Sequence, residues 1–360
     1  MKEAIALTVD AVVERLHAFD DILDARSPSE YQLDRLPGAT NTPVLDDEER
    51  ARVGTLYKQQ SGFEAKRVGA ALVSRNIAGL LEQRLAHKPR DWQPLIYCWR
   101  GGNRSGALAT VLAKIGWRCH LLEGGYKAFR ARVIADLAAQ PFGLQLIVLA
   151  GRTGTGKSAL LRRLRARGEQ ILDLESIAVH RGSVLGAHVD EPQPSQRFFE
   201  TGLWSALRAF DRNRPIWVES ESRRIGTCHQ PEALILAIRS APCIVVEADR
   251  AVRTALLMDE YRHLTADAKR LLDQLAHLIP LHGHQRIDSW RKLANQAEWR
   301  ELVESLLQFH YDPAYDRSMR SNFSHFAHAP AVRLNAADEM GLEAAVDSLI
   351  ATRRVLAHRG

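Results

Sequence analysis

One strand-to-helix passage determines the architecture of the second half of this chain: Leu146-Ile147-Val148-Leu149-Ala150-Gly151-Arg152-Thr153-Gly154-Thr155-Gly156-Lys157-Ser158. A buried strand is predicted at residues 144–150, and the residues after it match the G-x-x-x-x-G-K-[ST] phosphate-binding pattern. In such a loop, backbone N–H groups surround the phosphates, the lysine adds positive charge and the hydroxyl can ligate Mg2+. The predicted diphosphate-binding residues are Gly151, Thr153, Gly154, Thr155, Gly156, Lys157 and Ser158.

Strand and helix patterns alternate on both sides of this loop, which is typical of α/β proteins. Further strands are expected at residues 170–174, 215–219, 242–248 and 331–334. Together they predict a five-stranded parallel sheet of the nucleotide-binding type. Residues from about 251 to 322 show helical spacing, which indicates a helical insertion late in this fold.

Acidic residues follow two of these strands, where they could serve as an acid or hold a metal. Asp173 and Glu175 end one strand, and Glu219 and Glu221 end another. Carboxylates at strand ends have this role in phosphate-transferring proteins, and they are equally common as solvated side chains. We take Asp173 and Glu219 as the candidates, and the sequence assigns no metal site. Further on, His310-Tyr311-Asp312-Pro313 is explained equally by a helix-ending turn and by a substrate contact.

A second anion-binding pattern, Cys98-Trp99-Arg100-Gly101-Gly102-Asn103-Arg104-Ser105, lies between a predicted strand at 94–97 and a predicted helix at 105–116. The reactive form of cysteine is the thiolate, and an ordinary thiol pKa near 8.5 is too high for efficient attack at neutral pH. A helix N-terminus and nearby arginines lower it, and paired glycines let backbone N–H groups point inward. We therefore predict that Cys98 is a catalytic nucleophile in an anion cup formed by Arg100, Gly101, Gly102 and Arg104.

The alternating pattern is interrupted at residues 138–143, where Pro141 and Gly143 indicate a linker. Two domains are therefore expected, at residues 1–138 and 139–360. In the first domain, the patterns predict strands at 22–26 and 119–122, a helix at 64–86 and a loop at 36–43. The expected fold class is α/β throughout.

The composition is that of an ordinary globular protein, with 46% hydrophobic and 26% charged residues among 360. No apolar run reaches the roughly 20 residues that a membrane span needs. Because Met1-Lys2-Glu3-Ala4 lacks the apolar core of a signal peptide, a cytoplasmic location is expected. Four scattered cysteines argue against a disulfide framework or a zinc site. The net charge of +6 mildly favours a polyanionic partner, and basic clusters such as Arg162-Arg163 fit a solvated face and a nucleic-acid contact equally.

The first domain resembles the rhodanese family. The resemblance rests on residues 22–31 and 36–43, on the position of Cys98, and on Leu122-Glu123-Gly124-Gly125-Tyr126 as the closing segment. It implies that Cys98 carries a transferable chalcogen, as a persulfide or a selenyl sulfide.

The cysteine loop departs from the sulfur-transferring rhodaneses at one point. The C-x5-R spacing from Cys98 to Arg104 is one residue longer and equals that of rhodanese-like phosphatases. A phosphatase therefore stays open, although Tyr97 replaces the histidine that often precedes a phosphatase cysteine, and no general-acid aspartate is evident. A wider cup also suits a phosphate-bearing chalcogen donor such as selenophosphate.

A rhodanese-like domain followed by a phosphate-loop domain, in this order and size, resembles the tRNA 2-selenouridine synthase family over essentially the whole chain. Segments outside the two loops contribute to the resemblance: residues 53–58, 69–73, 172–175, 180–183, 218–222 and 310–313. The resemblance implies that the wobble 2-thiouridine of tRNAs for lysine, glutamate and glutamine is first S-geranylated from geranyl diphosphate. Selenium from selenophosphate then replaces the S-geranyl group.

By the same resemblance, Cys98 would carry the selenium and the Lys157 loop would bind a diphosphate. The loop pattern alone favours a nucleotide with Mg2+, whereas the chemistry of the family favours geranyl diphosphate. Two other interpretations remain: a cysteine phosphatase or sulfurtransferase fused to a nucleotide-binding domain, and a binding module whose nucleotide regulates a partner. The intact cysteine loop disfavours the second of these. A monomer is expected.

Overall fold

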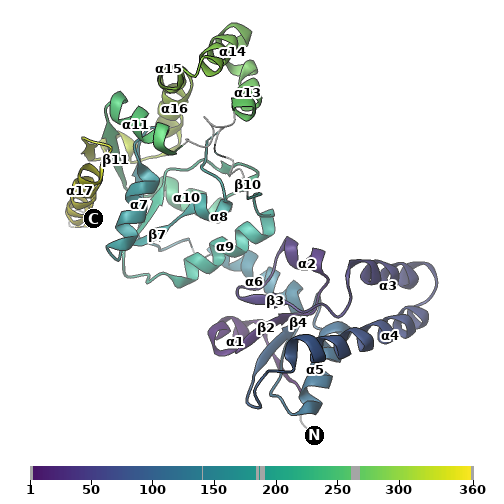
Figure 1. The fold of residues 1–360 in the computed structure, drawn as a ribbon. Helices are drawn as coiled ribbons and strands as arrows, with labels where there is room; N and C mark the ends of the chain where they lie inside the picture. The colour runs from purple at the N-terminus through teal and green to yellow at the C-terminus, as the bar shows by residue number, and fades with distance from the viewer. Residues whose placement is uncertain (1–2, 140, 184–185, 187–190, 261–267, 358–360) are drawn as a thin grey trace. The chain divides into compact units, whose positions relative to one another are not determined.

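The computed structural model describes residues 3–139, 141–183, 186, 191–260 and 268–357. The chain divides into two compact units: the first comprises Met1–Leu137 and Pro194–Ser205, and the second comprises Ala138–Gln193 and Ala206–Gly360. Each unit has an α/β fold built on a parallel sheet, as predicted (Figure 1). Among the described helices, none has the length and apolar character required to cross a membrane.

The sheet of the first unit has five parallel strands in the order β1-β5-β4-β2-β3. They are β1 (Ile5–Leu7), β2 (Asp21–Asp24), β3 (Ala39–Asn41), β4 (Pro94–Tyr97) and β5 (His120–Leu122). The strands predicted at 22–26, 94–97 and 119–122 are confirmed as β2, β4 and β5. The prediction of a loop at 36–43 is wrong in part, because β3 lies within it and pairs with β2. Strand β1 was not predicted. Both β1 and β3 are three-residue edge strands whose residues are mostly exposed or half-buried.

The helices of the first unit are α1 (Val9–Val13), α2 (Pro28–Leu33), α3 (Asp47–Gln59), α4 (Gly62–Leu80), α5 (Asn103–Ile115) and α6 (Gly125–Ala139). Helix α5 packs on β4 and β5, and α3 packs on α4. The side chain of Ser61 caps α4 by accepting a hydrogen bond from the Glu64 backbone N–H. Buried residues of α4 and α5, among them Leu72 and Leu108, share one core with Ile96 of β4. The predicted helix at 64–86 corresponds to α4 and the π-helical turn η2 (Leu81–Leu85) that follows it.

The sheet of the second unit has five parallel strands in the order β12-β11-β6-β8-β7. They are β6 (Leu146–Ala150), β7 (Gln170–Leu172), β8 (Ile216–Glu219), β11 (Cys243–Ala248) and β12 (Ala331–Leu334). All five predicted strands are confirmed. β6, β8 and β11 are mostly buried and apolar, whereas in β12 the buried Val332 and Leu334 alternate with the exposed Ala331 and Arg333. In both sheets the functional loop follows the third strand in spatial order, where the carboxyl ends of parallel strands typically form ligand sites.

The remaining elements of the second unit are α7 (Lys157–Ala166), α8 (Leu174–Ala178), the hairpin β9 (Arg224–Ile225) and β10 (Cys228–His229), α10 (Glu232–Ser240) and α17 (Glu339–Ala357). Helix α9 (Gln196–Ala209) begins among the residues assigned to the first unit. Helices α7 and α17 pack together on the sheet, where Leu160 and Val346 share a core with Leu149 of β6. This packing fixes the start of α7, and with it the phosphate-binding loop.

The helical insertion predicted at about 251–322 is confirmed between β11 and β12. It contains α11 (Arg250–Glu260), α13 (Ala268–Ala276), α14 (Ile279–Asn295), α15 (Trp299–Leu306), the π-helical turn η3 (Leu307–Tyr311) and α16 (Asp312–Asn322). Helices α13 to α15 have a core of their own around Trp290 and Ile287. Figure 1 shows these helices and α16 gathered together away from the sheet.

Candidate functional site

Cys98 directly follows β4 and lies at the entrance to α5, whose N-cap is Gly102. Its side chain is 3% exposed. The Ser105 hydroxyl on the first turn of α5 donates a hydrogen bond to Cys98 Sγ at 3.1 Å. The loop therefore holds the thiol against the N-terminal end of a helix, as the sequence pattern predicts.

The cysteine loop is held by backbone hydrogen bonds to the segment that begins Glu123-Gly124-Gly125-Tyr126. The Tyr126 backbone N–H donates to Cys98 O at 2.8 Å, and the Lys127 N–H donates to Trp99 O at 3.0 Å. Gly125 has a φ of +57°, and a Cβ atom there would lie 2.3 Å from Cys98 O. Only glycine fits this approach, which explains the paired glycines of the closing segment.

The environment of Cys98 favours its thiolate. Burial alone opposes ionisation, but hydrogen bonds from Ser105, the backbone N–H of Arg100 and the positive charge of Arg104 outweigh it, so the pKa of Cys98 is lowered. Burial raises the pKa of Cys119 and of Cys243 to about 11. Cys98 is thus the cysteine best suited to nucleophilic attack.

Replacing Ser105 with alanine is expected to raise the pKa of Cys98, because the thiolate loses a hydrogen-bond donor. A hydrogen bond to a charged group contributes about 1.5 kcal/mol or more, so alkylation by iodoacetamide at neutral pH should slow by roughly tenfold. The measurement is the rate of Cys98 alkylation against pH, followed by peptide mass spectrometry. An inflection at the same pH in both proteins, with unchanged thermal unfolding, would contradict this account.

The two arginines of the predicted cup differ in their contacts. Arg104 forms a two-pronged ion pair with Glu30, with nitrogen–oxygen distances of 2.5 and 3.2 Å. Glu30 also lies in the first turn of α2, so this pair connects α2 to the cysteine loop. Arg100 is exposed, and among the ion pairs of the described residues it has no acidic partner. Its guanidinium is therefore available to an incoming anion, and Arg104 acts on the thiol by its charge.

The second loop joins β6 to α7, whose N-cap is Gly156. Gly154 has a φ of +82°, and a Cβ atom there would lie 2.8 Å from the side chain of Leu257. Lys157 Nζ donates to Gly151 O at 2.8 Å, and the Thr155 hydroxyl donates to Arg152 O at 2.9 Å. The loop lines a cavity of about 490 Å³. A diphosphate entering this cavity would meet the loop and the ammonium group of Lys157.

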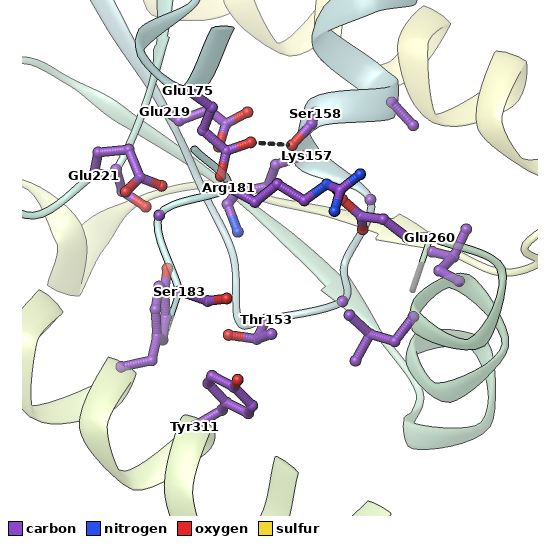
Figure 2. Close-up of a pocket in the computed structure, with 18 of the residues that line it drawn as sticks. Thr153, Lys157, Ser158, Glu175, Arg181, Ser183, Glu219, Glu221, Glu260 and Tyr311 are labelled. Carbon is purple, nitrogen blue, oxygen red and sulfur yellow. Dashed lines mark hydrogen bonds and ion pairs between the residues drawn. The ribbon is translucent and has the colours of Figure 1, made fainter. Parts of the chain in front are cut away.

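Three carboxylates gather at the Ser158 end of this cavity (Figure 2). One oxygen from each of Glu175, Glu219 and Glu221 lies within 4.8 Å of the others, and the Ser158 hydroxyl donates to Glu175 at 2.9 Å. Burial raises the pKa of each carboxyl and the charges of its neighbours raise it further, while Lys157 lowers all three. Oxygen ligands of this kind suit Mg2+, so these residues fit the ion that the loop pattern implies.

The two acids named from the sequence therefore lie in different places. Glu219 is buried and belongs to the carboxylate cluster. Asp173 caps α8 by accepting a hydrogen bond from the Ser176 N–H at 3.0 Å, and it lies 3.4 Å from Arg165. Glu175, two residues further along, enters the cluster instead, because the chain becomes helical directly after Asp173.

The helical insertion contacts the phosphate-binding loop directly. Arg253 of α11 donates to Thr153 O at 2.9 Å and forms an ion pair with Asp312 of α16 at 2.5 Å. The Tyr315 hydroxyl accepts a hydrogen bond from the Gly151 backbone N–H at 2.6 Å. Arg253 was not predicted as a site residue. The polar cluster at residues 310–313 was, as one of two interpretations, a predicted substrate contact. Figure 2 shows Tyr311 at the opposite end of the cavity from Glu175 and Glu219.

The chain was compared with known proteins. The family model described as "tRNA 2-selenouridine synthase AAA domain" matches residues 144–331, and the rhodanese-like domain model matches residues 8–132. The tRNA 2-selenouridine synthase of Marinobacter nauticus is 33% identical over 82% of this chain and 87% of its own length. That of Nitrosomonas europaea is 35% identical over 70% of this chain and 66% of its own length.

A solved structure also matches the chain. It is the N-terminal domain of a putative ATP/GTP binding protein from Clostridium difficile 630, which is 34% identical and covers 36% of this chain and 98% of its own, with a TM-score of 0.32. The two family models follow each other in the order predicted from the two loops. The family model over residues 144–331 and the 33% identity to the Marinobacter nauticus protein over 82% of this chain show that the chain belongs to the tRNA 2-selenouridine synthase family.

Proposed function

We propose that this protein converts the wobble 2-thiouridine of cytoplasmic tRNAs for lysine, glutamate and glutamine into 2-selenouridine in two steps. In the first, the 2-thio group is alkylated by geranyl diphosphate. In the second, selenium from selenophosphate replaces the S-geranyl group. One observation carries the proposal: a thiol with a lowered pKa and a phosphate-binding loop beside a carboxylate cluster occur on the same chain.

The first step is assigned to the phosphate-binding loop. Its backbone and Lys157 would hold the diphosphate, and Ser158 with Glu175 and Glu219 would hold Mg2+. A bound Mg2+ would neutralise charge on the departing diphosphate. In the reaction, the thiocarbonyl sulfur forms a bond to C1 of the geranyl chain as the bond from C1 to the diphosphate oxygen breaks. The diphosphate leaves with the electron pair, and the alkylated base loses its N3 proton to water.

The second step is assigned to Cys98, which would release the selenium from its donor. Arg100 and the N–H groups of the glycine pair would hold the anionic donor beside the thiolate, and Ser105 keeps the thiol ionised. The Cys98 thiolate would attack the phosphorus of selenophosphate, so that an S–P bond forms as the P–Se bond breaks and hydrogen selenide leaves with the electron pair. The selenide then attacks C2 of the uridine, where the C2–Se bond forms and the C2–S bond breaks, and water later hydrolyses the S–P bond to free the thiol. The geranyl thiolate leaves with the electron pair and takes up a proton. Prior alkylation is needed because an alkylated sulfur leaves far more easily than a thiocarbonyl sulfur.

The cysteine phosphatase is the second candidate, favoured by the C-x5-R spacing of the loop. Such an enzyme needs a general acid to protonate the leaving alkoxide. Among the described residues that line the cavity at Cys98, none is acidic. Glu30, the nearby carboxylate, is paired with Arg104 and its pKa is lowered despite burial, chiefly by that hydrogen bond. These contacts favour group transfer over phosphate ester hydrolysis.

The test of the proposal is mass spectrometry of nucleosides from 2-thiouridine-containing tRNA incubated with the protein, geranyl diphosphate, selenophosphate and Mg2+. We expect S-geranyl-2-thiouridine first and 2-selenouridine afterwards. Selenouridine that forms equally well without geranyl diphosphate would overturn the two-step order. Unchanged tRNA together with phosphate release from a phosphoester would favour the phosphatase.

A further inference from the structure

A large cavity opens beside Cys98, and neither loop pattern accounts for it. Its volume is about 900 Å³, within the range of roughly 300 to 1,000 Å³ typical of small-molecule sites. It lies where α3 and α4, which run side by side in Figure 1, meet the cysteine loop. One end of the cavity is formed by Cys98, Trp99 and Arg100. A molecule in this cavity would therefore be within reach of the nucleophile.

Part of the wall contributed by the two helices is apolar. Val53 and Tyr57 of α3 face the cavity together with Ala70 and Val73 of α4, and Tyr57 is 66% exposed. A Cβ atom on Gly69 of α4 would lie 3.5 Å from Val53, so the helices are already in contact there. Hydrocarbon side chains therefore form one side of the open volume.

The rest of the lining is cationic. Arg50, Lys58, Lys66, Arg100 and Arg104 all line the cavity, and no carboxylate does so among the described residues. Arg104 and Arg50 approach Glu30, at 2.5 and 3.9 Å. Lys58, Lys66 and Arg100 are exposed and form none of the ion pairs found among the described residues. The cavity thus combines an apolar wall with an excess of positive charge, which suits a ligand that is both hydrocarbon and polyanion.

We propose that this cavity binds the S-geranyl group of the alkylated tRNA during selenium transfer. The prenyl chain packs against Val53, Tyr57, Ala70 and Val73, while the phosphates that flank the uridine contact the cationic residues. This placement rests on the proposed function and brings C2 of the base to Cys98. The geranyl group would then have two roles: it leaves as the thiolate, and its prenyl chain binds the substrate to the enzyme. Binding contacts remote from the reacting atoms can contribute to the rate of the reaction. The selenouridine product has no prenyl chain, so it binds more weakly and is released.

The test uses the full-length protein and anticodon stem-loop RNAs carrying S-geranyl- or S-methyl-2-thiouridine at the wobble position. Ala70→Trp fills the cavity, and the matched control Ala71→Trp places the same side chain on an adjacent exposed position of α4 that does not line it. We expect the wild type to prefer the S-geranyl RNA in kcat/KM for selenation by about tenfold to a hundredfold. This preference should collapse in Ala70→Trp and persist in Ala71→Trp.

A binding readout accompanies the kinetics. The nucleoside S-geranyl-2-thiouridine should protect Cys98 from iodoacetamide in the wild type and in Ala71→Trp, but not in Ala70→Trp, with thermal unfolding measured for each protein. Equal kcat/KM for the two RNAs in the wild type, or a preference and protection retained by Ala70→Trp, would overturn the cavity assignment and leave the proposed function standing. A wild type that selenates neither RNA would instead overturn the proposed function.

Discussion

Cys98→Ala should reduce formation of 2-selenouridine by about a thousandfold or more, while S-geranyl-2-thiouridine accumulates in the tRNA. The structure provides the reason, because the thiol hydrogen-bonded by Ser105 has the lowered pKa, whereas burial raises that of Cys119 and Cys243. Geranylation should continue, since it is assigned to the phosphate-binding loop. The measurement is liquid chromatography and mass spectrometry of nucleosides after timed incubation with both donors.

Cys119→Ala is the matched control for this experiment. Cys119 is buried in the core of the same unit and does not line the cavity at Cys98. The control should therefore retain selenation, with a modest loss of thermal stability from the small cavity that the substitution leaves. Selenouridine made by Cys98→Ala at the rate of this control would show that Cys98 does not deliver the selenium.

Lys157→Ala should reduce geranylation by on the order of a hundredfold, because the departing diphosphate loses its positively charged partner. Lys157 donates to Gly151 O at 2.8 Å within the loop, and its charge also lowers the pKa of the three nearby carboxyls. The measurement is the initial rate of S-geranyl-2-thiouridine formation at several geranyl diphosphate concentrations, so that KM and kcat are separated.

Two comparisons make this second experiment specific. Arg165→Ala removes a cation from the same helix at a position outside the cavity, where it pairs with Asp173, and should leave geranylation unchanged. RNA that is already S-geranylated should be selenated by Lys157→Ala at the wild-type rate, since it bypasses the first step. If Lys157→Ala geranylates normally but loses binding of ATP, the loop holds a nucleotide and geranyl diphosphate binds elsewhere.

Much of the fold could be predicted from local sequence, because β6, β8 and β11 of the second sheet are mostly buried and apolar and end at glycine or acidic residues. Strands β1 and β3 could not: β1 pairs with the distant β5, Ile5 beside His120, and β3 consists of Ala39, Thr40 and Asn41, of which only Ala39 is buried. The same limit applies to the contact of Arg253 with Thr153, which joins residues a hundred positions apart.

The candidate site was predictable in its loops and only partly in its acids. The two glycine-rich loops can be recognised in the sequence because their backbone geometry requires glycine at fixed positions. Asp173 and Glu175 could not be ranked in the same way, because both follow one strand and their roles depend on where α8 begins. Asp173 takes the N-cap position, and Glu175 is consequently the residue that reaches Ser158.

The carboxylate cluster makes the folding stability of the second unit depend on pH and on its ligand. With pKa values raised above their ordinary 4.5, Glu175, Glu219 and Glu221 bind more protons in the native state than in the unfolded one. Stability therefore falls as the pH rises above 4.5, and the loss is largest once all three are ionised. A divalent cation that binds only the native state offsets this loss by mass action. At neutral pH the supply of that cation would then govern how long the chain stays folded, as well as how fast it works.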